Sequence, residues 1–349
     1  MNWMIYGANG YTGRLTAVEA VRRGMRPVLG GRNEAEITRL AGELGLEFRI
    51  FSLENSADIR AALAEMRLVL HCAGPFSATS EPMTAACLAT GVHYLDITGE
   101  IAVFAAAHAL HEQARRADVV LLPGAGFDVV PSDCLAASLV NALPAATRLL
   151  LAFEGGGGLS PGTAKTSIEG LSGGGFVRKG GVLKNVPLAW KTRTIPFAHA
   201  ERTAVTIPWG DVYTAYVSTG VPDIEVYMAQ KPAAINNMRR LRWVQGLLGF
   251  GPVQSFLKRK IEKKVSGPDE RQRKDSTSQL WGKAVTADGR SAEATMTTPN
   301  GYDLTVTASL GIVDFLLNND VEGGYYTPSL LMGAGYAASL PGVEFNLKS

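Results

Sequence analysis

The sequence holds few cysteines, and they form neither a disulfide framework nor a metal site. Cys72, Cys87 and Cys134 are the three cysteines among 349 residues, and no two of them form a CxxC pair. An odd number of isolated cysteines is typical of a reducing compartment. The five histidines supply no third ligand for a metal. We therefore expect a cytoplasmic protein without a bound metal.

A strong charge of one sign and long apolar runs are also missing. Lys and Arg number 34 and Asp and Glu 32, so the formal net charge is +2, which argues against a general nucleic-acid-binding protein. No apolar run reaches the ~18 residues of a membrane-spanning helix. The chain enters an apolar strand at once, so we expect no signal peptide. The hydrophobic content of 46% fits a globular protein of about two domains.

The sequence does contain a glycine motif directly after a short apolar strand. Residues 3–6 are apolar, Gly7, Gly10 and Gly13 follow with GxxGxxG spacing, and a helical pattern runs to residue 24. In a dinucleotide-binding βαβ unit these glycines make the tight turn, admit the pyrophosphate and let helix and strand pack closely. The pyrophosphate then lies at the helix N-terminus, which favours an anion. The motif predicts a nicotinamide dinucleotide site; a glycine-rich turn without a ligand is the alternative.

Strands alternate with helical patterns from residue 3 to about residue 125. Asn33 and Glu36 stand as in a capping box at the start of the second helix. This alternation predicts an α/β fold, with a doubly wound parallel Rossmann sheet over residues 1–125. The six expected strands are residues 3–6, 27–31, 46–51, 68–73, 92–98 and 119–124.

Residues 126–325 differ in character and predict a second, α+β domain. Glycine becomes dense, and alternating patterns favour a mixed or antiparallel sheet. A last helix is expected over residues 326–340. The strands expected in this domain are residues 147–153, 203–207, 212–218, 223–229, 292–297 and 302–309.

Residues 238–265 carry eight basic residues against one acid, interleaved with apolar side chains. The pattern predicts two basic amphipathic helices broken at residues 249–252. One interpretation is a helical hairpin that packs on the second sheet or on the neighbouring subunit of a homodimer. The other is a surface that contacts a membrane, which would make the protein peripheral to it, or a lipid-like acyl substrate.

The residues after the strands bear on the choice of cofactor. An acid at the end of the second strand would bind the ribose 2′-OH of NAD, but this chain has Arg32 there. A guanidinium can hold a 2′-phosphate with two hydrogen bonds, so we expect NADP(H) rather than NAD(H). A solvent-facing arginine is the alternative. Ser52 and Leu53 would lie near the adenine. The loop expected near the nicotinamide ribose consists of Cys72, Ala73, Gly74 and Pro75.

Candidates for proton transfer lie in the segment that ends the fifth strand and in the one that follows the sixth, because ligands bind at the carboxyl ends of strands in open α/β sheets. Tyr94, Asp96 and Asp128 are the catalytic candidates, with capping or a buried hydrogen bond as the alternative role for each. Glu100 stands where a helix N-terminus favours an acid. Lys165, in a stretch of small residues, is a candidate substrate contact.

Seven motifs follow one another along nearly the whole chain: YGANGYTGR, GGR, HCAGPF, YLDITGE, PGAGFDVVPSD, SPGTAKTSIEGL and GGYYTPSLLMG. This series resembles the saccharopine dehydrogenase-like oxidoreductases, nearest the trans-acting enoyl reductase branch. The resemblance implies an NAD(P)H-binding Rossmann domain, a second domain for the substrate, and a C-terminal helix within residues 326–349 that returns to the first domain. The cofactor contacts that it implies are Gly7, Asn9, Gly10, Tyr11, Thr12, Gly13 and Arg32.

Two functional hypotheses follow. The first is an NADP(H)-dependent oxidoreductase that transfers a hydride to an unsaturated or imine carbon of a small or acyl substrate. The resemblance extends this to enoyl reduction in trans on a lipid or polyketide chain. The second is a dinucleotide-binding sensor or scaffold without catalysis, because no clear catalytic dyad stands in the sequence.

Overall fold

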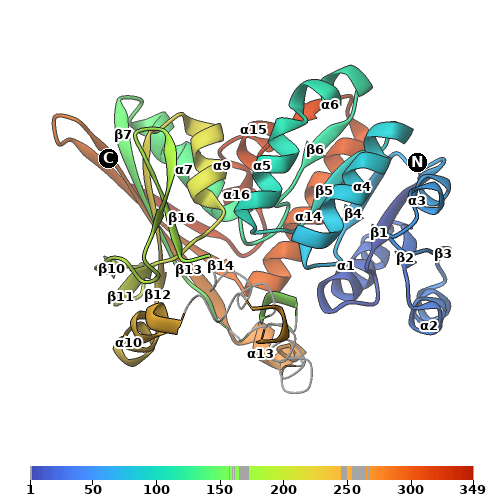
Figure 1. Ribbon diagram of the computed structural model, residues 1–349, viewed down its shortest axis with the longest axis horizontal. Coiled ribbons are helices and arrows are strands. Elements are labelled where there is room, and N and C mark those ends of the chain that lie inside the picture. Colours follow the sequence, from blue (N-terminus) through green and yellow to red (C-terminus); the bar gives the residue numbers. More distant parts are fainter. Residues whose placement is uncertain are drawn as a thin grey trace. The chain divides into compact units, whose positions relative to one another are not determined.

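The computed structural model describes residues 2–156, 158, 160, 162–164, 173–244, 250–253, 265 and 267–348. The chain divides into two compact units (Figure 1). The first unit comprises Met1–Asp128 and Tyr302–Leu331, and the second Val129–Gly301 and Met332–Ser349. Among the described helices, none has the length and apolar character needed to span a membrane.

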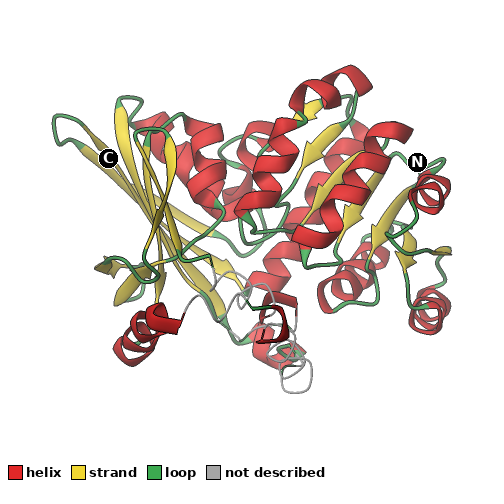
Figure 2. Ribbon diagram, viewed as in Figure 1, coloured by secondary structure: helices red, strands yellow, loops and turns green. Residues whose placement is uncertain are grey.

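The first unit is built on a parallel sheet with the strand order β15-β6-β5-β4-β1-β2-β3. Apart from β15, this is the order of a Rossmann sheet, which confirms the predicted fold class. The order reverses between β1 and β4, which pair in parallel and form the switch point. The strands, drawn as yellow arrows in Figure 2, are β1 (Trp3–Tyr6), β2 (Val28–Gly31), β3 (Phe48–Ile50), β4 (Leu68–His71), β5 (His93–Asp96), β6 (Val120–Leu122) and β15 (Gly324–Tyr325).

Local signals in the sequence account for the helices between these strands. Asn33 caps α2 by accepting a hydrogen bond from the Glu36 N–H, and Gly45 ends it in the left-handed region at φ +63°. Ile59, Met83 and Ala114 of α3, α4 and α6 pack into one apolar cluster with Tyr94 of the sheet. The helices are α1 (Tyr11–Arg22), α2 (Glu34–Leu44), α3 (Ser56–Leu63), α4 (Phe76–Thr90), α5 (Ile101–Ala109), α6 (His111–Ala117), α14 (Gly301–Asn318) and α15 (Pro328–Met332).

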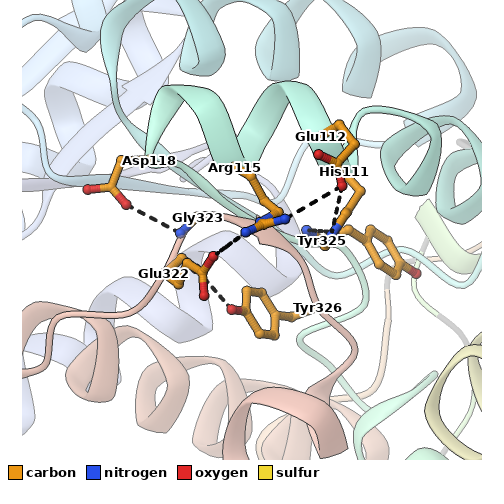
Figure 3. A network of polar contacts seen from close by, with 8 residues as sticks. All are labelled: His111, Glu112, Arg115, Asp118, Glu322, Gly323, Tyr325 and Tyr326. Atoms are coloured by element: carbon orange, nitrogen blue, oxygen red, sulfur yellow. Dashed lines mark hydrogen bonds and ion pairs between the residues drawn. The ribbon is translucent and has the colours of Figure 1, made fainter.

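The short strand β15 comes from far along the chain and is held at the β6 edge by side chains of α6 and the turn after it (Figure 3). Arg115 donates to the Glu322 carboxylate at 2.8 Å, and His111 Nδ1 accepts from the Tyr325 N–H at 3.0 Å. The Asp118 carboxylate accepts from the Gly323 N–H at 3.3 Å. This network fixes the seventh strand of the sheet.

The second unit is built on a mixed sheet, as predicted. Strand β7 pairs in parallel with β12 and antiparallel with β13. Helix α7 packs on β13, where a Cβ on Gly282 would stand 2.7 Å from Leu139. The strands are β7 (Ala146–Glu154), β8 (Gly175–Lys179), β9 (Val182–Val186), β10 (Thr192–Pro196), β11 (Glu201–Thr206), β12 (Asp223–Ala229), β13 (Thr277–Thr286), β14 (Ser291–Pro299) and β16 (Glu344–Lys348). The helices are α7 (Val130–Ala142), α9 (Asp211–Thr219), α10 (Pro232–Leu241), the 3₁₀ turn η1 (Arg242–Val244), α13 (Glu270–Lys274) and α16 (Tyr336–Ser339).

Three predicted elements of the C-terminal half are wrong. Residues 212–218 and 302–309 lie in helices α9 and α14, not in strands. Residues 326–340 form the two short helices α15 and α16, because Gly333 takes φ +84°, a left-handed conformation that ends the first of them. The chain then enters β16, which pairs with β14 in the second unit, so no single helix spans residues 326–349.

The structure describes part of the predicted basic pair of helices. Residues 245–249 and 254–264 lie outside the described residues. The Arg242 guanidinium donates to the carbonyl oxygens of Leu188 and Ala189 at 2.6 and 2.7 Å, which ties the end of α10 into the second unit. The neighbouring Trp243 is 92% exposed, so its apolar ring lies in solvent. Membrane, acyl-chain or subunit contact through residues 238–265 stays a prediction.

Candidate functional site

The turn after β1 depends on the absence of two side chains. Gly7 has φ +80°, and its N–H donates to Gly30 O at 2.8 Å. A Cβ on Gly7 would stand 2.8 Å from the Ala73 Cβ, and one on Gly13 would overlap Gly7 O and stand 2.9 Å from the Ala8 Cα. These distances lie far inside van der Waals contact. Gly7 and Gly13 are therefore required by the close approach of the turn, α1 and the loop after β4.

The N-terminus of α1 fits a pyrophosphate. Gly10, its N-cap residue, has no side chain to occupy the position, and the first turn contains no acid. Free helix N-termini of this kind bind phosphate oxygens through backbone N–H groups. Thr12 lies in this turn, and its carbonyl accepts from Thr16 Oγ1 at 2.9 Å. The Tyr11 ring packs edge-on against Tyr302 at 4.9 Å between ring centroids, which fixes the side chain beside the turn.

Arg32 is placed at the end of β2, as the sequence predicts. Its side chain is exposed and forms no hydrogen bond or ion pair with the described residues. Burial raises the pKa of the Tyr6 phenol to about 12, and the positive charge of Arg32 opposes this shift. The guanidinium is thus available to a ligand at the strand end. An open depression surrounds it, lined by Arg32, Asn33, Glu34, Ala35, Thr38 and Arg39.

Asn9 and Glu36 meet at the same end of β2. Asn9 Nδ2 donates to Glu36 Oε2 at 2.6 Å. Asn9 Oδ1 stands 3.2 Å from the position of a Cβ on Gly31. The sequence predicted only a capping role for Glu36, and no local pattern pairs it with Asn9, 27 residues earlier.

The adenine-side candidates follow β3. The Ser52 hydroxyl accepts from the Glu54 N–H at 3.4 Å, and Leu53 packs against the apolar cluster that contains Tyr6. The Phe51 N–H donates to Gly31 O at 3.1 Å, which holds this segment beside the end of β2. Ser52 and Leu53 therefore lie next to the strand end that Arg32 follows.

The loop after β4 is ordered by two residues that the sequence did not indicate. His71 Nε2 lies 3.0 Å from Thr79 Oγ1, which donates to Ala73 O at 2.7 Å. Burial lowers the pKa of His71 to about 3, so the ring is neutral. Burial and the Asp96 charge raise the pKa of Cys72 to about 12, so its thiol stays protonated. The segment from Cys72 to Pro75 is thus held by Thr79 and contains no thiolate that could act as a nucleophile.

Glu100 caps a helix other than its own. Its carboxylate accepts from the backbone N–H groups of Phe76 and Ser77, at 2.9 and 2.8 Å, at the start of α4. It is the N-cap residue of α5 but forms no side-chain cap there. The sequence analysis expected Glu100 at a position where a helix N-terminus favours an acid. The structure places its carboxylate at the N-terminus of α4 and not at that of α5.

Tyr94 and Asp96 are buried inside the first unit. The Tyr94 hydroxyl donates to Asp96 Oδ2 at 2.7 Å, and Asp96 Oδ1 accepts from the N–H groups of Thr98 and Gly124, both at 2.9 Å. Burial raises the pKa of Asp96 to about 6 against the effect of these bonds. The pair joins the ends of β5 and β6, and neither side chain is exposed to a substrate. Tyr94 and Asp96 are therefore placed as in the alternative role considered from the sequence, in which each forms a buried hydrogen bond.

Asp128 differs from that pair because it is partly exposed at the carboxyl edge of the sheet. Its Oδ2 stands 2.9 Å from the position of a Cβ on Gly99, so the loops after β5 and β6 meet there. Burial first, and then the Glu100 charge, raise the pKa of Asp128 to about 7. A carboxyl group with this pKa can carry a proton near neutral pH.

The raised pKa of Asp128 predicts that the stability of the protein depends on pH. Because folding raises its pKa from 3.8 to about 7, the folded state binds the proton more tightly, and the free energy of unfolding falls as the pH rises through this range. Asp128→Asn should therefore raise the melting temperature more at pH 8 than at pH 5, by the equivalent of about 1–2 kcal/mol for a partly exposed group. The control Asp58→Asn, at an exposed residue, should change the melting temperature by the same amount at pH 5 and at pH 8. Equal shifts for Asp128→Asn would contradict the raised pKa.

Lys165, the candidate substrate contact, lies outside the described residues. The described residues contain no group of three or more His, Cys, Asp or Glu side chains that could hold a metal ion.

Comparison with known proteins finds a family that the N-terminal part of the chain resembles. Residues 3–122 match the family described as the saccharopine dehydrogenase NADP binding domain. This part of the chain, 120 of its 349 residues, is similar to that family's domain. The match covers the glycine-rich turn, Arg32 and the strand ends up to β6, so the domain is of the NAD(P)-binding type.

Two relatives carry related names. The chain is 31% identical over 185 residues to a candidate trans-acting enoyl reductase of Mycobacterium tuberculosis, covering 48% of this chain and 44% of that protein. It is 28% identical over 204 residues to the saccharopine dehydrogenase-like oxidoreductase of Mus musculus, covering 50% and 47%. The chain thus spans about half the length of the curated relatives that it matches.

Two solved structures share the fold over nearly the whole chain. The apo saccharopine dehydrogenase (L-Glu forming) of Saccharomyces cerevisiae has a TM-score of 0.71 at 11% identity, and covers 100% of both chains. The homospermidine synthase of Legionella pneumophila, solved with NAD, has a TM-score of 0.64 at 10% identity and covers 99% of this chain and 91% of its own. At these identities the likeness shows the fold alone.

Proposed function

We propose that the protein is an NADP(H)-dependent oxidoreductase that reduces an unsaturated or imine carbon of a small or acyl substrate. The observation that carries the proposal is the shared position, at the carboxyl edge of one sheet, of the Gly7–Gly13 turn, Arg32 and Asp128. The turn and α1 would hold the pyrophosphate, and Arg32 the 2′-phosphate. The names of the relatives favour enoyl reduction in trans as one form of this activity.

The bound NADPH would supply the hydride, and this chain would supply the proton. Reduction of a C=C or C=N bond adds one hydride and one proton. Asp128 in its acid form would give the proton to the second atom of that bond and become a carboxylate. Glu100, which caps α4 close by, keeps the pKa of Asp128 high. Tyr94 and Asp96 would hold the strand ends in position.

NADPH oxidation, followed at 340 nm with a panel of enoyl thioesters and imines, tests the proposal. We expect turnover whose rate falls as the pH rises through about 7, because Asp128 then loses its proton. Asp128→Asn should lower kcat by about 100-fold, the lower range of general acid catalysis, and leave the NADPH Kd unchanged. NADPH binding without turnover on any member of the panel would favour the sensor or scaffold hypothesis instead.

A further inference from the structure

Glu36 departs from the capping role that its position predicts. Its N–H donates to Asn33 Oδ1 at 3.3 Å, so one half of a capping box forms. Its carboxylate, however, accepts a short hydrogen bond from Asn9 Nδ2 at 2.6 Å. Asn9 belongs to the glycine-rich turn. An acidic side chain of α2 therefore reaches the turn that would hold the dinucleotide phosphates.

This Asn9–Glu36 pair lies over the end of β2. Asn9 Oδ1 stands 3.2 Å from the position of a Cβ on Gly31, and Arg32 is the next residue. One anionic and one cationic side chain thus flank the strand end. In a Rossmann domain the adenosine ribose lies at this place, and its 2′ substituent distinguishes NAD from NADP.

We propose that Glu36 is a specificity-determining residue that opposes Arg32. A carboxylate accepts a hydrogen bond from the free ribose hydroxyl of NADH but repels the charge of the 2′-phosphate of NADPH. Arg32 acts in the opposite direction. The two residues together limit the preference for NADPH, so that the site accepts both dinucleotides. The inference rests on the dinucleotide site of the proposed function.

Fluorescence titrations with NADPH and with NADH test this balance without any substrate. Glu36→Gln keeps an oxygen that can accept the Asn9 hydrogen bond but removes the charge. We expect the ratio of NADPH to NADH affinity to rise about tenfold, the effect of one like charge at a few ångströms from a phosphate at a solvent-exposed site. The control is Glu47→Gln, which makes the same charge change at an exposed residue directly before β3, at the edge of the sheet opposite to the dinucleotide site. Its ratio should stay within about twofold of the parent value.

The outcomes separate the inference from the function on which it rests. An unchanged ratio for Glu36→Gln, in a protein that binds NADPH normally, would overturn the role of Glu36 and leave the dinucleotide site intact. An equal rise in Glu47→Gln would show that the effect comes from net charge alone and would also overturn the role of Glu36. Absence of binding by the parent protein would instead remove the dinucleotide site itself.

Discussion

Gly13→Ala will remove the binding of both NADPH and NADH and lower the free energy of unfolding by about 2–3 kcal/mol. The added methyl group would overlap the Gly7 carbonyl oxygen and lie 2.9 Å from the Ala8 Cα. Both are backbone atoms, which cannot rotate away as a flexible side chain can. The turn must therefore shift, and the phosphate position shifts with it. Urea unfolding and fluorescence titration measure the two losses.

Gly42→Ala is the matched control for this substitution. Gly42 lies in α2, and a Cβ there would meet no atom within 4 Å. Alanine in a helix is more stable than glycine by about 0.5–1 kcal/mol, so this variant should gain stability and bind as the parent does. Normal dinucleotide affinity in Gly13→Ala would show that the close approach is not a requirement of binding.

Arg32→Ala will weaken NADPH binding by about 30- to 300-fold and change NADH binding by less than about threefold. The guanidinium is exposed and has no ion-pair partner among the described residues. Two charge-assisted hydrogen bonds to a 2′-phosphate are therefore lost without compensation, about 2–3.5 kcal/mol in all. Paired titrations with the two dinucleotides measure the difference.

Arg22→Ala serves as the control for the loss of one positive charge. Arg22 ends α1 and pairs with Glu19 at 2.6 Å, so its removal should leave both affinities unchanged. Equal loss of NADPH and NADH affinity in Arg32→Ala would assign Arg32 to the stability of the strand end, and the preference for NADP(H) would then have no support in this residue.

The Rossmann half of the fold could be predicted because its signals are local. Each strand is a short apolar run, and residues such as Asn33 and Gly45 mark helix ends within a few positions of the pattern that they bound. The long helix α14 gave no such signal. Buried residues lie on most of its surface, including Val306, Ile312 and Val313, so it has no single apolar stripe, and its β-branched residues favour a strand.

The candidate site could be predicted only where one segment specifies it. The glycines and Arg32 are read directly from the ends of β1 and β2. The partners of Glu36 and Glu100 could not be read, because each carboxylate binds a group 23 to 27 residues earlier in the chain. Distinguishing the buried Tyr94–Asp96 pair from the partly exposed Asp128 required the tertiary structure, since the sequence shows only that all three stand near the carboxyl end of a strand.

The position of β15 governs the order in which this protein can be assembled. The edge of β6 pairs with Gly324 and Tyr325, which a ribosome adds only after nearly all of the second unit has been synthesised. Until then the backbone N–H and C=O groups of that edge lack their strand partner, a state that favours pairing between chains. A truncated protein that ends at Asp128 would keep the glycine-rich turn and Arg32 but lose this protection. Shortened forms should therefore retain residues 302–331.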